Sequence, residues 1–352
     1  MTQPGPRPAD AHQDRAGVRV AVDAMGGDHG PSEVVPGAID HARAHPEDTV
    51  ILVGDETIIR AAAAGVLPAN VTIVAASQVV GMDEHPALAL REKKDSSILV
   101  AVDLVKAGQA DAVVTAGHTG AGMAAAVLRL GRLEGVDRPA LAVQMITASG
   151  PMVLLDIGAN PDSTPENLVQ YGLMGAIFAE RVMGVVNPRV ALLSIGEEKG
   201  KGDARIQRAT ELLDATDLNF TGNVEGKDLT THEADVVVCD AVLGNVVIKF
   251  FEGLSTFIFD LWRAEFEGSV RGRMAYVAMR PGIDRIRGIF DYEKVGGSPL
   301  LGVRGTVIIT HGRAKRRMVA YACDVAATTA RTRVPELIAE SLGAGRRSGG
   351  TA

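Results

Sequence analysis

Cysteine is nearly absent from this sequence, and aromatic residues make up 4% of it. Its two cysteines, Cys239 and Cys323, lie far apart and show no CxxC or Cys/His spacing. This argues against both a disulfide framework and a structural zinc site. A net charge of −7 argues against a protein dedicated to nucleic acid, whose surface would be broadly basic. We therefore expect no nucleic-acid partner.

Long apolar runs are missing as well. No run of 18 apolar residues is free of charge, so we expect no helix that spans a membrane. Residues 1–17 are polar, contain several Pro and Ala, and lack the apolar core of a signal peptide. We expect residues 1–17 and 343–352 to be disordered tails of a cytoplasmic chain.

Several catalytic signatures are also missing. The chain has no GxSxG elbow, no GxxxxGK[ST] run, no HExxH or carboxylate–His metal grouping, and no cysteine in a charged turn. Residues 120–125 half-match a dinucleotide fingerprint, but the next predicted strand supplies no acid for the ribose. We therefore predict neither a cofactor nor a metal. Direct attack by a bound anion is the most economical chemistry, with the protein positioning it and stabilising an oxyanion.

Glycine, by contrast, is abundant, with 40 residues and no fixed period. Short β-branched runs alternate with helical patterns, and several runs are continuously apolar, as in strands covered on both faces. The predicted strands are 18–23, 50–54, 71–75, 112–116, 141–145, 152–157, 190–195, 235–239 and 306–310. The predicted helices are 32–44, 97–107, 121–133, 166–182 and 203–213. This alternation predicts an α/β fold with a doubly wound, mostly parallel sheet, in a single catalytic domain over 18–342.

One segment near 246–290 breaks the pattern and is predicted to be a helical insertion. Residues 250–266 hold five of the eight Phe residues and the only Trp. Apolar residues on one helical face there are Phe250, Leu254, Phe257, Ile258, Leu261 and Trp262. This face could be core, a dimer seam, or a surface that meets lipid or an acyl chain. The next stretch carries a local excess of arginine, at Arg271, Arg273, Arg280, Arg285 and Arg287, which could also be an ordinary solvated face.

Ligands of such sheets bind beyond the carboxyl ends of the strands. The turn at 26–31 offers a proton-handling pair, Asp28 and His29, unless Asp28 or Ser32 caps the helix and His29 points to solvent. Residues 89–97 place cations beside two serines, as in a phosphate cradle, although a surface charge run is the alternative. The loop 196–202 is either mobile or a site. Residues 296–303 are predicted to form a turn packed against apolar side chains.

Eight segments then occur in one order, from about residue 18 to 335. They are MGGDHGP, REKKDSS, TAGHTGA, LLDIGAN, LLSIGEEKGKG, GNVEGKD, VVCDAVLGNVVIKFFEG and GGSPLLGVRGTVIITHG. Together they resemble the phosphate acyltransferase family. Three departures are visible: His118 stands where the family commonly has Asn or Ser, the tail of the GEEKGKG loop differs, and Phe250–Phe251 stand where smaller polar residues are usual.

The resemblance implies a fold similar to the phosphotransacetylase and isocitrate-dehydrogenase-like group. It implies transfer of a fatty acyl group from acyl-[acyl carrier protein] to inorganic phosphate, making the acyl phosphate that a glycerol-3-phosphate acyltransferase uses in phospholipid synthesis. It also implies a homodimer in the cytoplasm, peripheral at the inner face of the plasma membrane. An acyl-CoA-dependent phosphotransacetylase, a phosphate- or lipid-binding scaffold and a metal-dependent hydroxyacid dehydrogenase are the alternatives.

These observations predict a set of site residues. The predicted catalytic residues are His29, which would protonate the departing thiolate or orient phosphate, Asp28 and Lys94. The predicted phosphate- or substrate-binding residues are Gly26, Gly27, Lys93, Ser96, Ser97, Gly117, His118, Thr119, Gly120, Asn160, Asn245 and Lys249. The predicted face for the carrier protein or the membrane comprises Phe257, Trp262, Arg271, Arg273 and Arg280.

Overall fold

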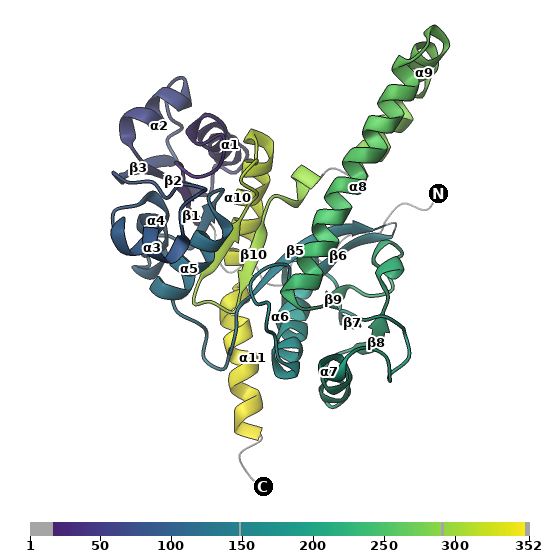
Figure 1. The fold of residues 1–352 in the computed structure, drawn as a ribbon. Coiled ribbons are helices and arrows are strands. Elements are labelled where there is room, and N and C mark those ends of the chain that lie inside the picture. The colour runs from purple at the N-terminus through teal and green to yellow at the C-terminus, as the bar shows by residue number, and fades with distance from the viewer. Residues whose placement is uncertain (1–16, 148, 290–291, 349–352) are drawn as a thin grey trace.

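The computed structural model describes residues 17–147, 149–289 and 292–348. Their strands form one eleven-stranded sheet in the order β3-β2-β1-β4-β11-β10-β5-β6-β9-β7-β8 (Figure 1). The strands are β1 (Arg19–Asp23), β2 (Thr49–Gly54), β3 (Val71–Ala75), β4 (Ala112–Thr115), β5 (Ala140–Thr147), β6 (Gly150–Leu155), β7 (Val190–Leu193), β8 (Phe220–Val224), β9 (Val236–Val238), β10 (Ser298–Leu301) and β11 (Thr306–Ile309). Each of the nine predicted strands is present.

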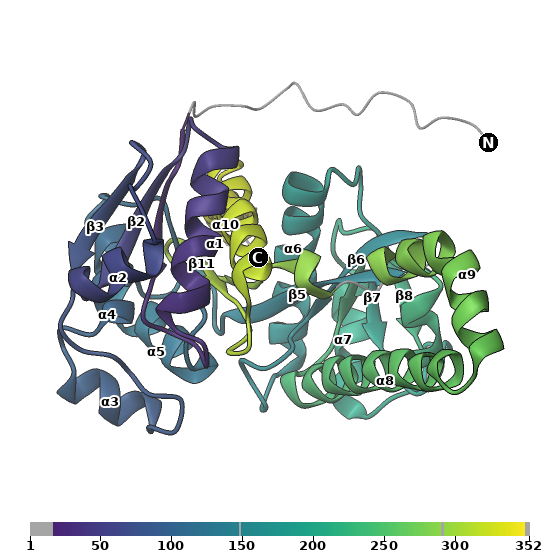
Figure 2. The same ribbon diagram turned by 90° about the horizontal axis from the view of Figure 1, so that it is seen from above.

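Helices cover both faces of the sheet, as a doubly wound fold requires (Figure 2). They are α1 (Pro31–Ala44), α2 (Glu56–Ala63), α3 (Pro86–Glu92), α4 (Ser97–Lys106), α5 (Thr119–Arg129), α6 (Pro165–Met183), α7 (Ala204–Asp214), α8 (Ala241–Glu267), α9 (Val270–Ile289), α10 (Arg316–Arg331) and α11 (Val334–Ser348). Two short 3-10 helices are η1 (Gly226–Thr230) and η2 (Tyr292–Val295).

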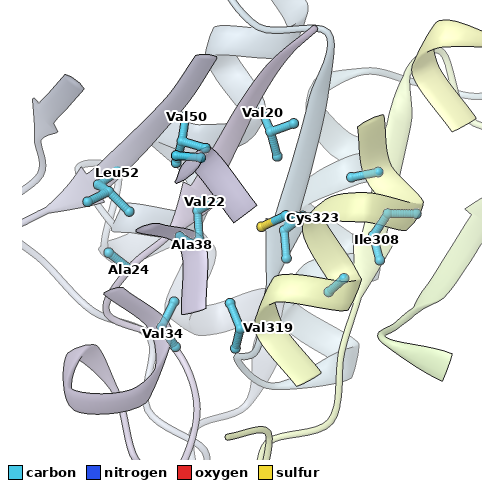
Figure 3. Close-up of a cluster of buried hydrophobic side chains, with 14 of the residues drawn as sticks. Val20, Val22, Ala24, Val34, Ala38, Val50, Leu52, Ile308, Val319 and Cys323 are labelled. Carbon is cyan, nitrogen blue, oxygen red and sulfur yellow. The ribbon is translucent and has the colours of Figure 1, made fainter. Parts of the chain in front are cut away.

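The apolar strand residues build a core on each face of the sheet. On one face α1 and α10 pack against β1, β2 and β11, with Ala38 and Val319 meeting strand residues such as Val22 (Figure 3). On the other face α3, α4 and α5 pack against side chains that include Ala21 and Val113. Because both faces are buried, the strands read as continuous apolar runs in the sequence.

The strand direction reverses part-way across the sheet. Strand pairs are parallel except β10–β11, β10–β5 and β5–β6, which are antiparallel. The carboxyl ends of β1, β4 and β11 therefore lie at one edge, and those of β6, β9 and β7 lie at the other. Although β6 runs opposite to β11, residues that follow β6 and β9, such as Gly158 and Ala241, line the same cavity as residues that follow β1, β4 and β11.

Helices α8 and α9 form a hairpin that projects away from the sheet (Figures 1 and 2). The apolar side chains of α8 are largely exposed, with Phe250 at 68% and Phe257 at 62%. The suggestion that this face is core is therefore wrong for the single chain. Within the described residues, α8 is also long and apolar enough to cross a membrane by length and composition alone. Our expectation required a run free of charge, whereas the apolar part of α8, residues 241–259, contains the two charged residues Lys249 and Glu252.

Three other expectations differ from the structure. Strand β8 was not predicted, because Phe220–Val224 contains a glycine and an asparagine and lacks a continuous apolar run. The expected turn at 296–303 contains β10, an antiparallel strand between β11 and β5. Residues 343–348, expected to be a disordered tail, belong to α11. The expected tails at 1–16 and 349–352, and the side chain of Arg287, lie outside the described residues.

Candidate functional site

A cavity of about 820 Å³ runs along β5, between α8 and the carboxyl ends of β1, β4 and β11. Much of its wall is apolar, with side chains from β5 and α8 that include Leu141, Val143, Met145, Val242, Val246 and Phe251. Polar side chains line it too: Asp28, Thr119, Asn245, Lys249 and His311. Such a cavity fits a ligand with a long apolar part and a polar head.

Asp23 organises the turns at the polar edge of the cavity. The register of β1 with β4 sets Asp23 opposite Thr115, whose hydroxyl donates to the Asp23 carboxylate at 2.7 Å. Burial raises the pKa of Asp23, and the hydroxyls of Ser97 and Thr115 oppose that rise. A Cβ at Gly26 would lie 2.8 Å from both this carboxylate and the Gly117 amide nitrogen. The predicted glycines at 26 and 117 are therefore needed because two turns cross above one buried carboxyl.

The same edge is joined to the loop after β11. The amide of Asp28 donates to the carbonyl of Gly312 at 2.8 Å. Gly27 has a φ of 91°, and a Cβ there would lie 3.1 Å from the carbonyls of Ala116 and Gly312. Three turns, far apart in sequence, thus meet at Gly27.

His118 caps α5. Its Nδ1 accepts the amide of Gly120 at 3.0 Å, which is the role of an N-cap side chain. Asn and Ser supply the same kind of acceptor, so His118 keeps the helix start that those residues would give. The amide of Gly120 is used by this cap, while Thr119 and Gly120 line the cavity. The start of α5, at Thr119, thus lies on the cavity wall, and its helix dipole is positive at this end.

His311, which we did not single out from the sequence, faces Lys249 across the cavity. The distance from Lys249 Nζ to His311 Nε2 is 3.3 Å. Burial lowers the pKa of His311, and the positive charge of Lys249 lowers it further, so the imidazole is neutral near pH 7. The amide of Arg313 donates to His311 Nδ1 at 3.1 Å, which leaves the ring proton on Nε2. Lys249 Nζ also pairs with Glu252 Oε2 at 2.9 Å, so an anion placed beside His311 Nε2–H and Lys249 Nζ would share this lysine with Glu252.

A second buried aspartate lies at the end of β6. The carboxylate of Asp156 accepts the amides of Leu141, Gly158, Ala159 and Asn160 at 2.7–3.1 Å. Burial raises its pKa, and these amides oppose the rise. The side-chain nitrogen of Asn160 donates to Pro139 O, Tyr171 Oη and Asp156 Oδ2. The polar groups of this turn thus hydrogen-bond to one another and to neighbouring backbone.

The predicted cradle at 93–97 is divided by the structure. Lys93 Nζ donates to Glu84 at 2.6 Å and to the carbonyl of Val79, so it holds the 79–84 loop. Lys94 is exposed, and neither lysine is among the described residues that line the cavity. Ser96 and Ser97 are buried, and Ser97 lies beside Asp23. Of the four predicted residues, Ser97 therefore contacts the polar edge through Asp23, and the two lysines lie off the cavity wall.

His29 also lies away from the cavity wall. Its side chain is exposed, as in the alternative in which it points to solvent. Neither Asp28 nor Ser32 caps α1: the cap position is Gly30 with no side-chain bond, and the Ser32 hydroxyl donates to the carbonyl of His29. Asn245 and Lys249 do line the cavity, from α8. On the hairpin, Phe257, Trp262, Arg271, Arg273 and Arg280 are exposed, away from this site.

Comparison with known proteins decides the family. A family model described as "Fatty acid synthesis protein" matches residues 18–337. The chain is 47% identical over 310 residues to a phosphate acyltransferase of Desulfitobacterium hafniense (strain Y51), covering 88% of this chain and 92% of that protein. A phosphate acyltransferase of Brevibacillus brevis is 42% identical over 326 residues, covering 92% and 97%. The chain belongs to the phosphate acyltransferase family. The family, and the enzyme class predicted from the eight segments, are confirmed.

Solved structures of other enzymes have the fold that the resemblance to phosphate acyltransferases implied. A phosphotransacetylase from Streptococcus pyogenes superposes with a TM-score of 0.59 at 17% identity, covering 89% of this chain and 94% of that one. A branched-chain phosphotransacylase from Enterococcus faecalis gives a TM-score of 0.55 at 15% identity, covering 90% and 99%. At these identities the likeness concerns the fold, and it confirms the predicted fold class.

Proposed function

We propose that this phosphate acyltransferase transfers a fatty acyl group from acyl-[acyl carrier protein] to inorganic phosphate bound between His311 and Lys249. The observation that supports this proposal is the proximity of His311 Nε2 and Lys249 Nζ, 3.3 Å apart on the wall of an apolar cavity, where Glu252 holds the lysine at 2.9 Å in the absence of an anion. A phosphate oxygen placed there accepts from both. The apolar wall along β5 and α8 then receives the acyl chain, with its carbonyl carbon next to the phosphate.

The reaction needs little from the protein besides placement. One oxygen of HPO₄²⁻ attacks the thioester carbonyl carbon, a C–O bond forms, and the carbonyl becomes a tetrahedral oxyanion. The C–S bond then breaks and releases the thiolate. The remaining proton of the phosphate group passes to the thiolate, which is the stronger base, while His311 keeps its Nε2 proton and donates it to the phosphate; the products are acyl phosphate and a free thiol.

The start of α5 supports this arrangement. The Thr119 hydroxyl and the positive end of the helix dipole lie on the same cavity and favour negative charge in the attacking phosphate and in the oxyanion. Asp28 lies there too, and its charge would hold a dianion away from the turn of Gly27 and toward Lys249. His29 and Lys94, predicted from the sequence, are not part of this mechanism.

The test measures phosphate-dependent loss of acyl thioester and traps the acyl phosphate as a hydroxamate. Acyl carrier protein and CoA donors are compared with one enzyme preparation. We expect turnover that requires phosphate and is faster with the carrier-protein donor. Turnover on acyl-CoA alone would assign the phosphotransacetylase alternative, and thioester binding without turnover would assign the scaffold.

The projecting hairpin supports a second part of the proposal. Its exposed apolar residues on α8 fit a homodimer contact or the surface of a membrane that holds a glycerol-3-phosphate acyltransferase, and its arginines on α9 fit the acidic carrier protein. Replacing Arg271 and Arg273 by Glu should raise KM for the carrier protein, more so at low salt. Replacing Phe257 by Asp should shift the sedimentation coefficient toward monomer or reduce flotation with anionic vesicles. Unchanged values in all of these assays would remove the hairpin from the proposal.

A further inference from the structure

A cluster of histidines and carboxylates lies far from the cavity, where α1 meets α10. His41 stands in the last turn of α1 and His45 follows the end of that helix. Asp324 reaches them from α10, with its Oδ1 2.6 Å from His41 Nδ1 and 3.3 Å from His45 Nε2. The cluster lies at the opposite edge of the sheet from the carboxyl ends of β1 and β4, because α1 begins at that end of β1 and runs back to the start of β2.

We propose that His41, His45 and Asp324 bind one divalent transition-metal ion of the zinc class, which joins α1 to α10. Their ligand atoms, one from each residue, all lie within 4.8 Å of one another. Ligands at zinc distances in a tetrahedron are about 3.3 Å apart. His45 Nε2 and Asp324 Oδ1 already have this spacing, and the shorter separation from His41 requires a small movement of Asp324, whose side chain is 40% exposed.

The unused nitrogen of His41 supports the proposal. His41 is fully buried, and its Nε2 has no hydrogen-bond partner. This atom lies 3.7 Å from Asp48 Oδ2, and Asp48 is itself held by Arg331 and by the amide of Val18. When Nδ1 binds a metal, the ring proton moves to Nε2, where a carboxylate already faces it. Metal binding at Nδ1 therefore gives Nε2 a proton to donate to Asp48. This hydrogen bond is missing while Nδ1 donates to Asp324.

His45 has the same two-sided arrangement. Its Nε2 faces Asp324, while its Nδ1 lies 3.4 Å from Glu47 Oε1. Both histidines thus have one nitrogen directed at the metal position and the other directed at a carboxylate that can orient the ring. A second carboxylate behind each ligand histidine is the usual support of a protein zinc site. Water completes the coordination, because His45 and Asp324 are open to solvent.

This cluster is hard to predict from the sequence. The spacing H-x-x-x-H in 41–45 places both rings on one side of a helix end, but Asp324 lies 279 residues after His45. Our expectation that the chain has no carboxylate–His grouping is therefore wrong: the grouping is absent from the local sequence but is formed by the fold. The packing of α1 on α10 creates it: a Cβ at Gly37 would lie 2.4 Å from the carbonyl of Arg316 and 2.7 Å from Val319, so the two helices approach closely.

The test uses the full-length, untagged chain after treatment with a chelator. Zinc is titrated by calorimetry and by competition with a chromophoric chelator, and cobalt binding is followed by its visible absorption. We expect one equivalent of zinc and a Tm that rises with free zinc. The substitutions His45→Ala and Asp324→Asn remove the stoichiometric binding, and both residues are exposed enough to leave the fold intact. Glu47→Gln weakens binding by about 10–100-fold.

His85→Ala is the matched control, because His85 is an exposed histidine that makes no side-chain cap to its helix. It should bind zinc like the unaltered chain. Absence of stoichiometric uptake would overturn the proposal, and so would uptake that survives in both His45→Ala and Asp324→Asn. These readouts do not involve acyl transfer, so their outcome is independent of the proposed function.

Discussion

Two buried aspartates end two strands of this sheet, and their surroundings differ. Asp156 accepts four backbone amides and the side chain of Asn160, so its turn is closed by its own hydrogen bonds. Asp23 instead contacts the hydroxyls of Thr115 and Ser97 and only two backbone amides, of Met25 and Gly26, and it lies under two crossing glycine turns. The comparison shows that a glycine-rich turn after a strand can serve the fold alone.

The difference also indicates where a ligand binds. At the Asp156 turn, the N–H groups of 158–160 point back to the carboxylate. At the Asp23 edge, by contrast, Thr119, Lys249 and His311 present donors to the cavity. A buried N–H that is already paired gains little from an anion, whereas Lys249, half-exposed and paired with Glu252 at 2.9 Å, can share its charge with an anion beside His311. We therefore expect stability to depend on Asp156 and activity to depend on the Asp23 edge.

The largest expected effect is the loss of Asp156. Asp156→Ala leaves several buried amides without an acceptor and should reduce the free energy of unfolding by about 4 kcal/mol. Asp23→Ala removes the acceptor of two hydroxyls, which can rotate to other partners, and of two amides, of Met25 and Gly26, and should cost about half as much. Urea denaturation followed by circular dichroism measures both. Equal losses would break the contrast between the two aspartates.

The second prediction concerns the helix that rests on the Asp156 turn. A Cβ at Gly244 would lie 2.0 Å from the carbonyl oxygen of Asp156, so α8 begins in close contact with this turn. Gly244→Ala should reduce stability by about 3 kcal/mol through overpacking. Gly253→Ala in the same helix meets nothing within 4 Å and should increase stability by about 0.5–1 kcal/mol. The pair is compared by thermal unfolding, and a stable Gly244→Ala variant would show that α8 can shift freely.

The third prediction tests the ligand side of the comparison. Lys249→Met removes a charged donor at the proposed phosphate position and should raise KM for phosphate by about 10–100-fold. Lys94→Met changes a lysine that the sequence suggested but that lies off the cavity wall, and should change KM less. Steady-state kinetics at varied phosphate measure both. A larger effect at Lys94 would return the phosphate to the 93–97 segment.

The smallest effect concerns pH. The pKa of His311 lies below its ordinary value of 6.5, so the folded chain binds fewer protons at this residue than the unfolded chain. Stability from this group is complete above pH 6.5 and falls as the pH drops toward the lowered pKa. His311→Gln should remove this part of the slope. Denaturation midpoints between pH 5 and 7 measure it, and an unchanged slope would mean that His311 does not contribute.

The sequence predicted the fold well where the signal is local. The nine apolar runs each became a strand because side chains buried on both faces leave a continuous apolar pattern. Strand β8 was not predicted, because Phe220–Val224 is half-exposed and interrupted by Gly222. Strand β10 was not predicted, because Gly296, Gly297 and Pro299 are typical of a turn. In the structure this segment forms a strand between β11 and β5.

The site was predicted in part. Gly26, Gly117 and Ser97 do converge, and Asn245 and Lys249 do line the cavity. His311 was overlooked because no motif in the neighbouring sequence indicates that it donates a hydrogen bond to a ligand. Its lowered pKa arises from burial and from Lys249, 62 residues earlier. Lys93 was taken for a phosphate ligand because a charge run does not reveal that its partner is Glu84.

By itself, the sequence determined the family, the strand pattern and the glycine turns, because each depends on neighbouring residues. The tertiary structure decided how those turns are used. It set Asp23 under two crossing turns, closed the Asp156 turn on itself, and placed His311 against Lys249. It also brought Asp324 to His41 and His45 through the contact of α1 with α10 at Gly37. These pairings depend on strand order and helix packing, which local sequence does not specify.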